Sequence, residues 1–449
     1  MSTRIVHRPA RLHKKIKADK PIEIAAVPTI RGGGGGGVLM ALMPIVGGAG
    51  MVMMMMSSGN PIRMAIGSVM IVVVLFTAVG AFARNRTGKR KQAEDDRVRF
   101  IEHLGQVEQE IRERAQTQRS EALMRNPAPE MLADVVRDPY RIWERRRGDE
   151  DFLITRIGSG IGELATHVFV KPTNDPMAIS EPIAQAHLDR MLRRTRTIEG
   201  LPMSIPARGV ISLVGPLEQT TAAVRSIVLQ AAVFHAPDDL RIHVAQPYDG
   251  DWLLWLPHIL SPELFDGPIG KREVSHDEES ATELVEEIAS RVEELAEKSK
   301  YREATLDRPF FMVIVDMDTP HGKWVAGQLS ALPSVASGRM VLLAMSSSQY
   351  LEPSHVDVRV LLEDDNTFEV QLLSRGEIQE PAEGEEGYVE RMLYGGRKGT
   401  LDIIPISLAE AITRQLSPLR LVEDATPDAP LEQTIALDAM LGIQDFATY

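Results

Sequence analysis

Two apolar segments near the N-terminus constrain this chain more than any other feature. They cover residues 38–56 and 62–83, and a short turn at 57–61 separates them. Each segment is about 20 residues long, which is the length that a helix needs to cross a hydrocarbon core of about 30 Å. The sequence therefore predicts two transmembrane helices joined as a hairpin.

Both outer flanks of the hairpin are basic. The positive-inside rule places such flanks on the cytoplasmic side. We therefore expect a multi-pass protein of the inner cell membrane with both termini in the cytoplasm, and anionic lipids as partners of the basic flanks. The flanking cations are Arg4, Arg8, Arg11, Lys14, Lys15, Lys17 and Lys20 before the hairpin, and Arg84, Arg86, Lys89, Arg90 and Lys91 after it.

Charge is divided unevenly along the chain. Residues 1–91 hold 14 Lys and Arg against 2 Asp and Glu, a balance of +12, and since the whole chain carries −13, the remainder carries −25. This acidity argues against nucleic acid as a partner of the remainder, because duplex binding requires clustered cations. The chain has no cysteine, which excludes disulfides, zinc–thiolate sites and thiol catalysis.

Composition predicts five regions. They are a basic, disordered arm over 1–37, the hairpin over 38–83, a basic juxtamembrane segment with a helical stalk over 84–148, an α/β domain over 149–417, and a linker over 418–449.

The stalk helix, expected over 93–125, has a narrow apolar stripe of coiled-coil width. Two interpretations are open: the stripe packs on its own domain, or it pairs with a partner subunit. The stripe consists of Ile101, Leu104, Val107, Ile111 and Ala115.

Beyond residue 208, apolar strands alternate with helices. This order is typical of a mostly parallel sheet that is covered on both faces. We also expect strands at 152–154 and 167–170 around a glycine-rich turn at 158–162, and a β-hairpin added to the sheet. The predicted strands of the main series are 209–214, 240–245, 310–315, 340–345, 358–362 and 367–373, and its helices are 219–234, 279–301 and 324–332.

The first strand of this series leads through Gly215 into a helix, where a phosphate-binding loop belongs. Such a loop offers backbone N–H groups, a lysine and a Mg²⁺-binding hydroxyl. Thr220 and Thr221 stand near the hydroxyl position, but neither possible alignment has the lysine, and Glu218 adds a negative charge. The loop therefore looks like a degenerate nucleotide site.

A second part of such a site follows about one hundred residues later. Asp316 ends an apolar strand, where a carboxylate holds Mg²⁺ through water. The next residue is Met317 instead of a carboxylate that activates water. We predict weak contacts to ATP and Mg²⁺ at Gly215, Thr220, Thr221 and Asp316, with no catalytic residue and no dedicated metal site.

Several short motifs stand in a characteristic order along the chain. They are Trp143-Glu144-Arg145-Arg146-Arg147, Asp151-Phe152-Leu153, Arg156-Ile157-Gly158-Ser159-Gly160, the segment 215–240, Asp251-Trp252, Trp255-Leu256-Pro257-His258 and Leu441-Gly442-Ile443. In these motifs and their order, the chain resembles the EccC family, the membrane-anchored FtsK/SpoIIIE-type ATPases of type VII (ESX) secretion. The resemblance covers essentially the whole chain and implies a degenerate P-loop NTPase-like domain. It also implies partners similar to EccB, EccD and EccE, further copies of the chain, and secreted substrates.

Intact ATPase modules follow the degenerate one in that family, whereas this sequence ends at Tyr449. The expected function is therefore that of the membrane-proximal part of a secretion motor, which links ATPase modules to the channel for protein export. Two alternatives remain open: a DNA translocase subunit of the FtsK type, and a membrane scaffold that binds no nucleotide. Whether this stretch is itself an enzyme stays open as well.

Overall fold

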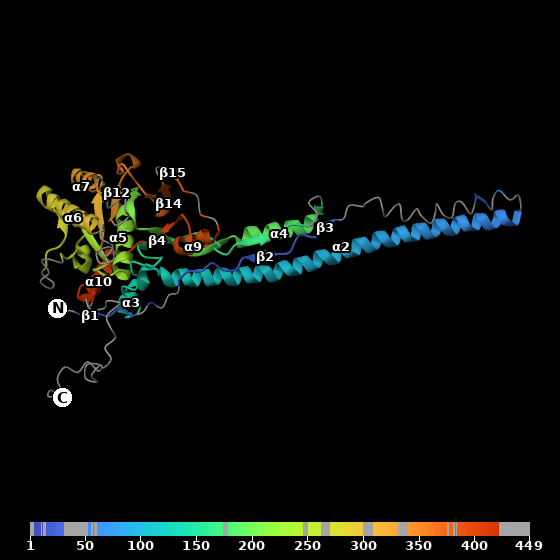
Figure 1. Ribbon diagram of the computed structural model, residues 1–449, viewed down its shortest axis with the longest axis horizontal. Coiled ribbons are helices and arrows are strands. Elements are labelled where there is room, and N and C mark those ends of the chain that lie inside the picture. The colour runs from blue at the N-terminus through green and yellow to red at the C-terminus, as the bar shows by residue number, and fades with distance from the viewer. Residues whose placement is uncertain are drawn as a thin grey trace, which may run out of the picture.

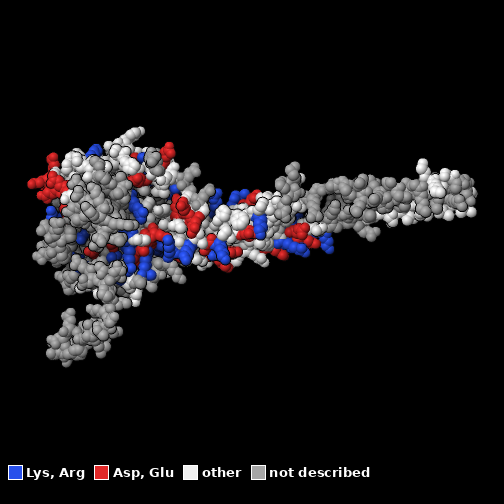
Figure 2. Space-filling view, in the orientation of Figure 1, with Lys and Arg blue, Asp and Glu red and all other residues white. Residues whose placement is uncertain are grey.

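The computed structural model describes residues 4–9, 11, 15–30, 53–54, 57, 61–173, 178–245, 250–261, 270–299, 309–330, 332, 340–374, 377–379, 382 and 384–421. Figure 1 shows a globular part at one end and a single long helix, α2 (Pro61–Arg125), that leads away from it. Figure 2 shows that basic and acidic side chains are intermixed on the visible face of this extension next to the globular part. At about 1.5 Å per residue, α2 is about 100 Å long. The predicted linker lies outside the described residues from 422 onward.

One mixed sheet of eleven strands organises the globular part, in the order β10-β9-β11-β12-β8-β13-β14-β16-β4-β7, with β15 paired to β14. The strands from β10 to β13 are parallel to one another, and those from β13 to β7 pair antiparallel. Their bounds are β4 (Ile154–Glu163), β7 (Thr197–Pro206), β8 (Gly209–Val214), β9 (Leu240–Ala245), β10 (Val274–Ser275), β11 (Phe310–Asp316), β12 (Met340–Ser346), β13 (Val358–Leu362), β14 (Thr367–Ser374), β15 (Glu377–Ile378) and β16 (Lys398–Leu401).

The prediction of a mostly parallel sheet is therefore wrong. Among the parallel strands, β8, β11 and β12 were recognisable because they are buried and almost entirely apolar. The expected hairpin is present as β13 and β14, but it continues into β16, β4 and β7. The stretch 158–162, expected as a turn, lies inside β4.

The glycines of β4 are required because the backbone of the segment 395–400 passes very close to them. A Cβ on Gly158 would lie 2.2 Å from the backbone oxygen of Thr400, and one on Gly162 would lie 2.2 Å from that of Gly395.

Helices cover both faces of the parallel half. On one face, α5 (Leu217–Phe234) packs with α3 (Leu132–Arg137) and α10 (Ile406–Leu416). On the other face lie α6 (Glu278–Ser299) and α7 (Pro320–Ser330). Strand β12 shows the alternation: Leu343 and Met345 face α5, whereas Leu342 and Ala344 face α7.

Three residues of the stripe predicted on α2 are buried inside the chain. Leu104, Val107 and Ile111 form one cluster with Phe100, β2 (Ile22–Ile24) and α4 (Pro182–Thr195), whereas Ile101 and Ala115 are only partly buried. Of the two interpretations of the stripe, the structure supports packing on the chain's own elements. A seam for a partner subunit is ruled out for the three buried residues, because their side chains are already covered.

Neither predicted transmembrane helix is found among the described residues. The second segment, 62–83, lies within α2, where large apolar side chains such as Ile62 and Phe76 are exposed. The first segment lies almost entirely outside the described residues, which include only 53–54 of it. Across the described part of the chain, no helix combines the length and the apolar character that a membrane crossing requires. The transmembrane part of the predicted fold and the multi-pass membrane localisation are thereby overturned.

The described part of the basic arm is ordered along the molecule, unlike the disordered arm expected over 1–37. It forms β1 (Arg4–Val6), β2 and β3 (Thr29–Ile30). These strands pair in turn with β17 (Leu419–Leu421), β5 (Val168–Val170) and β6 (Ile179–Ser180). The arm thus connects the last described strand of the globular part to the middle of α2. The remaining helix, α9 (Gly384–Tyr394), covers part of the antiparallel half.

Candidate functional site at the carboxyl edge of the sheet

The predicted nucleotide residues meet at one edge of the parallel half. Gly215 follows β8 and donates its N–H to the carbonyl of Ser346 at the end of β12, at 3.0 Å. Asp316 ends β11 and is paired with Met345 of β12. One strand therefore separates Gly215 from Asp316, a distance of about 10 Å at the usual strand spacing. Asp316 faces α5, because Met312 and Ile314 on the same face of β11 pack against that helix.

The connection between β8 and α5 is very short. It consists of Gly215 and Pro216 alone, since β8 ends at Val214 and α5 begins at Leu217. A Cβ on Gly215 would lie 2.5 Å from the carbonyl oxygen of Leu362, so the backbone passes close to β13. A loop that wraps around phosphates needs several residues with inward N–H groups. Two residues, one of them proline, do not supply that cradle.

The hydroxyls of Thr220 and Thr221 are already used within the helix. Thr220 Oγ1 donates to the carbonyl of Leu217 at 3.1 Å, and Thr221 Oγ1 lies 2.8 Å from the same carbonyl and 2.9 Å from that of Glu218. Both residues are buried. The structure therefore brings both threonines to the expected edge with their hydroxyls turned back onto the α5 backbone.

The entrance to this edge carries a negative charge, which is unfavourable for binding phosphates. Glu218 is exposed in the first turn of α5. Gln219 is buried and its Nε2 lies 3.4 Å from Asn366 Oδ1, so the β13–β14 turn covers the start of the helix.

The residues around Asp316 are apolar or engaged elsewhere. Met317 is buried in the cluster under α7. Asp318 accepts from Ser347 N at 3.0 Å and from Ser347 Oγ at 2.8 Å, so it fixes the loop after β12. Met345 faces α5 between β11 and β8 and is almost fully buried. A methionine there offers no hard oxygen ligand for Mg²⁺.

Taken together, these residues do not fit a working Mg·ATP site. Among the residues described at this edge there is no lysine after Gly215, no phosphate cradle and no carboxylate directly after Asp316, and the hydroxyls of Thr220 and Thr221 already donate hydrogen bonds. Sequence inspection found Gly215, Thr220, Thr221 and Asp316 but overlooked Met345. The Gly215-Pro216 pair was the available signal for the short connection.

The Trp143–Arg147 motif has a structural role in the described chain. Trp143 Nε1, Trp143 N and Arg145 N donate to the carbonyls of Ala232, Val233 and Phe234 at 3.1, 3.0 and 3.0 Å. These are the last carbonyls of α5, which have no partner inside the helix. The Arg145 guanidinium lies over the Phe234 ring at 4.3 Å, where a cation also complements the negative end of the helix dipole. The motif therefore caps α5.

A buried ion cluster lies beside this cap. Asp151 accepts from Arg11 Nη1 at 2.6 Å, and its Oδ2 lies 3.4 Å from Arg125 Nη1 and 3.7 Å from Arg145 Nε. Burial alone would raise the pKa of Asp151, but the Arg11 hydrogen bond and the three guanidinium charges hold it well below its usual range. Burial lowers the pKa of Arg145 to about 10 in spite of the Asp151 charge. The cluster joins the arm, the end of α2 and the start of β4.

Two buried histidines complete this junction. His235 Nδ1 lies 2.8 Å from the Ala231 carbonyl and His235 Nε2 accepts from Leu153 N at 3.0 Å. His258 Nε2 lies 2.8 Å from the His235 carbonyl. Burial lowers the pKa of each imidazole to about 3, so both are neutral near pH 7. Within the described residues, no group of three or more potential ligands could hold a metal ion.

Sequence comparisons with known proteins find EccC proteins, the family that the motifs resemble. No family model matches the chain. An EccC protein of the ESX secretion system from Thermomonospora curvata is 29% identical over 398 residues, which make up 85% of this chain and 27% of that protein. EccC3 of the ESX-3 secretion system from Mycobacterium tuberculosis is 33% identical over 220 residues, or 47% of this chain and 16% of that protein.

A solved structure, the cytoplasmic domain of the type VII secretion ATPase EccC from T. curvata, aligns with 62% of this chain and 36% of that chain at 14% identity, with a TM-score of 0.33. A score this low carries no argument about geometry.

The sequence relatives are named as proteins of ESX secretion systems. The resemblance to EccC is confirmed, since curated homologues of that name match much of the chain. The chain spans about a quarter of the length of the first of these relatives.

Proposed function

We propose that this chain forms a part of a type VII secretion motor that transmits movement and does not itself hydrolyse ATP. ATP hydrolysis would occur in other modules of the motor, and this part would link them to the export apparatus. The similarity to EccC supports the assignment to the motor.

The two-residue connection between β8 and α5 is the main observation that supports the proposed lack of ATP hydrolysis. Phosphoryl transfer depends on positioning and on neutralising the phosphate charge. Here the connection provides neither a cradle nor a lysine, and Glu218 adds negative charge beside it. Each loss of about 1.4 kcal/mol of transition-state stabilisation lowers the rate tenfold.

The transmitting role is supported by the way the arm links distant elements. Strand β1 pairs with β17 at one end, and β2 packs on α2 at the other. Between them, Arg11 binds the Asp151 cluster and Ile16 packs against Tyr388 and Met392 of α9. A displacement of β17 would therefore be passed through the arm to the long helix.

An ATP-turnover assay on the full chain tests the first half of the proposal. We expect no hydrolysis above background, with the same result for Asp316→Ala and for the control Asp134→Ala on the exposed face of α3. Hydrolysis that is lost only in Asp316→Ala would show a working site. A Mg·ATP binding titration on the same proteins separates a nucleotide-holding part from a scaffold that binds none.

The second half is tested in the complete motor by comparing export with ATP turnover. Arg11→Ala removes the arm's contact with Asp151, so we expect export to fall while ATP turnover continues. Arg112→Ala is the matched control, because that arginine is exposed on α2 and pairs only with its neighbour Glu108 among the described residues. Normal export by the Arg11 variant would contradict the transmitting role.

A further inference from the structure

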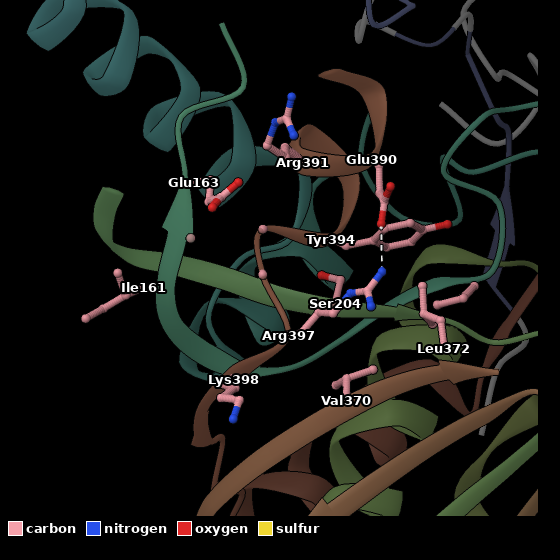
Figure 3. A pocket seen from close by; sticks show the side chains of 14 residues that line it. Ile161, Glu163, Ser204, Val370, Leu372, Glu390, Arg391, Tyr394, Arg397 and Lys398 are labelled. Atoms are coloured by element: carbon pink, nitrogen blue, oxygen red, sulfur yellow. Dashed lines mark hydrogen bonds and ion pairs between the residues drawn. The ribbon is translucent and has the colours of Figure 1, made fainter. Parts of the chain in front are cut away.

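A pocket lies between α9 and the antiparallel half of the sheet. It encloses about 340 Å³ and is partly open to solvent. This size is in the range of pockets that hold small molecules. In Figure 3, Ser204 of β7 lies between the ring of Tyr394 from α9 and the side chains of Val370 and Leu372 from β14. We call these four residues the Ser204 corner.

One polar group in this corner lacks a partner. Ser204 is only 3% exposed, and its Oγ has no hydrogen-bond partner among the described residues. The other members of the corner contribute apolar surface, namely the side chains of Val370 and Leu372 and the ring of Tyr394. Buried hydroxyls are normally satisfied by protein, water or a ligand. Ser204 therefore marks a position where a bound molecule would gain one hydrogen bond.

The acidic and basic groups nearest the Ser204 corner neutralise each other. Glu390 Oε1 of α9 lies 3.4 Å from Arg397 Nη2, and Figure 3 shows this ion pair beside the corner. A ligand in the corner thus meets both signs of charge in one pair. The other ion pairs of the pocket lining are Glu163 with Arg196 at 2.9 Å and Lys398 with Glu369 at 2.8 Å.

Arg391 also lines the pocket, but it is turned away from the corner. Its guanidinium points back along α9, where a Cβ on Gly387 would lie 3.4 Å from Arg391 Nη2. In Figure 3 it therefore lies apart from Ser204, Val370 and Leu372. It adds no charge at the place where a ligand would contact Ser204. The corner offers apolar walls, one hydroxyl without a partner among the described residues, and no net charge.

We propose that the Ser204 corner binds an uncharged amphipathic molecule with a single hydroxyl or carbonyl group. The apolar body of the ligand lies against Val370 and Leu372, and its polar group forms a hydrogen bond with Ser204 Oγ. A carboxylate placed there would face Glu390, and an ammonium group would face Arg397. Either ion would also lose its hydration without gaining an unpaired opposite charge, which costs more than burying a neutral group.

The pocket shares α9 with the arm. Tyr388 and Met392 of that helix pack with Ile16 of the arm, while Tyr394 belongs to the Ser204 corner. A ligand in the corner therefore contacts the helix that also anchors the arm. This inference does not depend on whether the carboxyl edge of the sheet hydrolyses ATP, so the two can fail separately.

Calorimetric titration of the full chain with 1-octanol tests the site. We expect one octanol per chain. Octanoate and octylammonium, which have the same alkyl chain and a charged head group, should each bind at least about tenfold more weakly, because the charge has to be desolvated. Leu372→Trp, which places a larger side chain in the corner, should abolish measurable binding. No measurable octanol binding by the parent, or an ion that binds as tightly as octanol, would overturn the proposal.

Two serine variants separate a hydrogen bond to the ligand from a general effect of removing a buried hydroxyl. Ser204→Ala should weaken octanol binding about fivefold, as expected for the loss of one neutral hydrogen bond. Ser212→Ala is the matched control and should leave the affinity unchanged. Ser212 of β8 is fully buried, its Oγ also has no hydrogen-bond partner among the described residues, and it does not line the pocket. Thermal unfolding checks that both variants are folded. Unchanged octanol affinity in Ser204→Ala, or an equal loss in Ser212→Ala, would contradict the assigned contact and overturn the proposal.

Discussion

The parallel and antiparallel halves of the sheet are built in different ways. In the parallel half, β8, β11 and β12 are apolar along nearly their whole length and are covered by helices on both faces. In the antiparallel half, β4 contains three glycines and depends on close backbone contacts with the segment 395–400. The first half therefore depends mainly on burial, whereas the second combines burial with close backbone contacts that only glycine allows.

The two halves also differ in their sites. The carboxyl edge of the parallel half brings Gly215, Thr220, Thr221 and Asp316 together, but its short connection and engaged hydroxyls do not fit Mg·ATP. The antiparallel half lines a pocket in which the hydroxyl of Ser204 has no hydrogen-bond partner among the described residues, and no sequence motif indicated this pocket. Position in a fold and the presence of a usable site are thus separate properties here.

The largest expected effect concerns the ion cluster that anchors the start of β4. Asp151→Asn leaves Arg145 buried without its charge partner, and breaking such a pair costs about 3–5 kcal/mol. Urea unfolding should show this loss, and hydrogen exchange should speed up in β4 before it does in β11. Asp149→Asn, at a more exposed carboxylate, should cost under about 1 kcal/mol. Equal exchange in both halves would contradict a separate anchor for the antiparallel half.

Alanine substitutions at two glycines compare a closely packed backbone position in β4 with an open position in α7. Gly158→Ala places a Cβ 2.2 Å from the Thr400 oxygen, so we expect a loss of about 3 kcal/mol or more in the free energy of unfolding. Gly327→Ala in α7 meets nothing within 4 Å and should stabilise the protein by up to about 1 kcal/mol. Chemical denaturation measures both changes in the free energy of unfolding. A small effect at Gly158 would mean that the β4–β16 contact is looser than the structure indicates.

The free energy of unfolding should decrease as the pH falls, in part because of the buried His235 and His258. Their folded pKa of about 3 lies below the ordinary 6.5, so the unfolded chain binds protons that the folded chain does not. Between pH 6.5 and about 4.5, each imidazole then removes about 1.4 kcal/mol per pH unit as the pH falls. In His258→Gln, the part of the pH dependence of the free energy of unfolding that is due to His235 and His258 should be about half as steep across this range. The exposed His276→Gln should keep the full slope.

The smallest effect is expected at the turn that joins the halves. Asn366 has a φ of 64°, a conformation that costs most residues about 1 kcal/mol. Asn366→Ala should therefore destabilise by about 1 kcal/mol, whereas Asn366→Gly should be nearly neutral. Thermal unfolding of the two variants distinguishes backbone strain from loss of the weak contact with Gln219. Equal losses in both would assign the effect to that contact.

Prediction from the sequence succeeded where a pattern is local. Strands β8, β9 and β13 begin and end at the predicted residues, and α5 and α7 differ only at their ends. The missing lysine and the Met317 substitution were likewise visible in the sequence. These features depend on residues that are neighbours in the chain.

Other features were decided only by tertiary contacts. The glycines of β4 suggested a turn until Thr400 and Gly395, over 230 positions away, were found against them. The α2 stripe suggested a partner until β2 and α4 were found covering it.

The pocket between α9 and the antiparallel half follows the same rule. Its lining comes from β4, β7, β14, α9 and the segment 395–398, and no local periodicity records such an arrangement. By itself, the sequence determined the apolar strands, the resemblance to EccC and the absence of a lysine directly after Gly215. The antiparallel half, the path of the arm and the pocket required the folded chain, because their contacts join segments whose separation no hydrophobic period encodes.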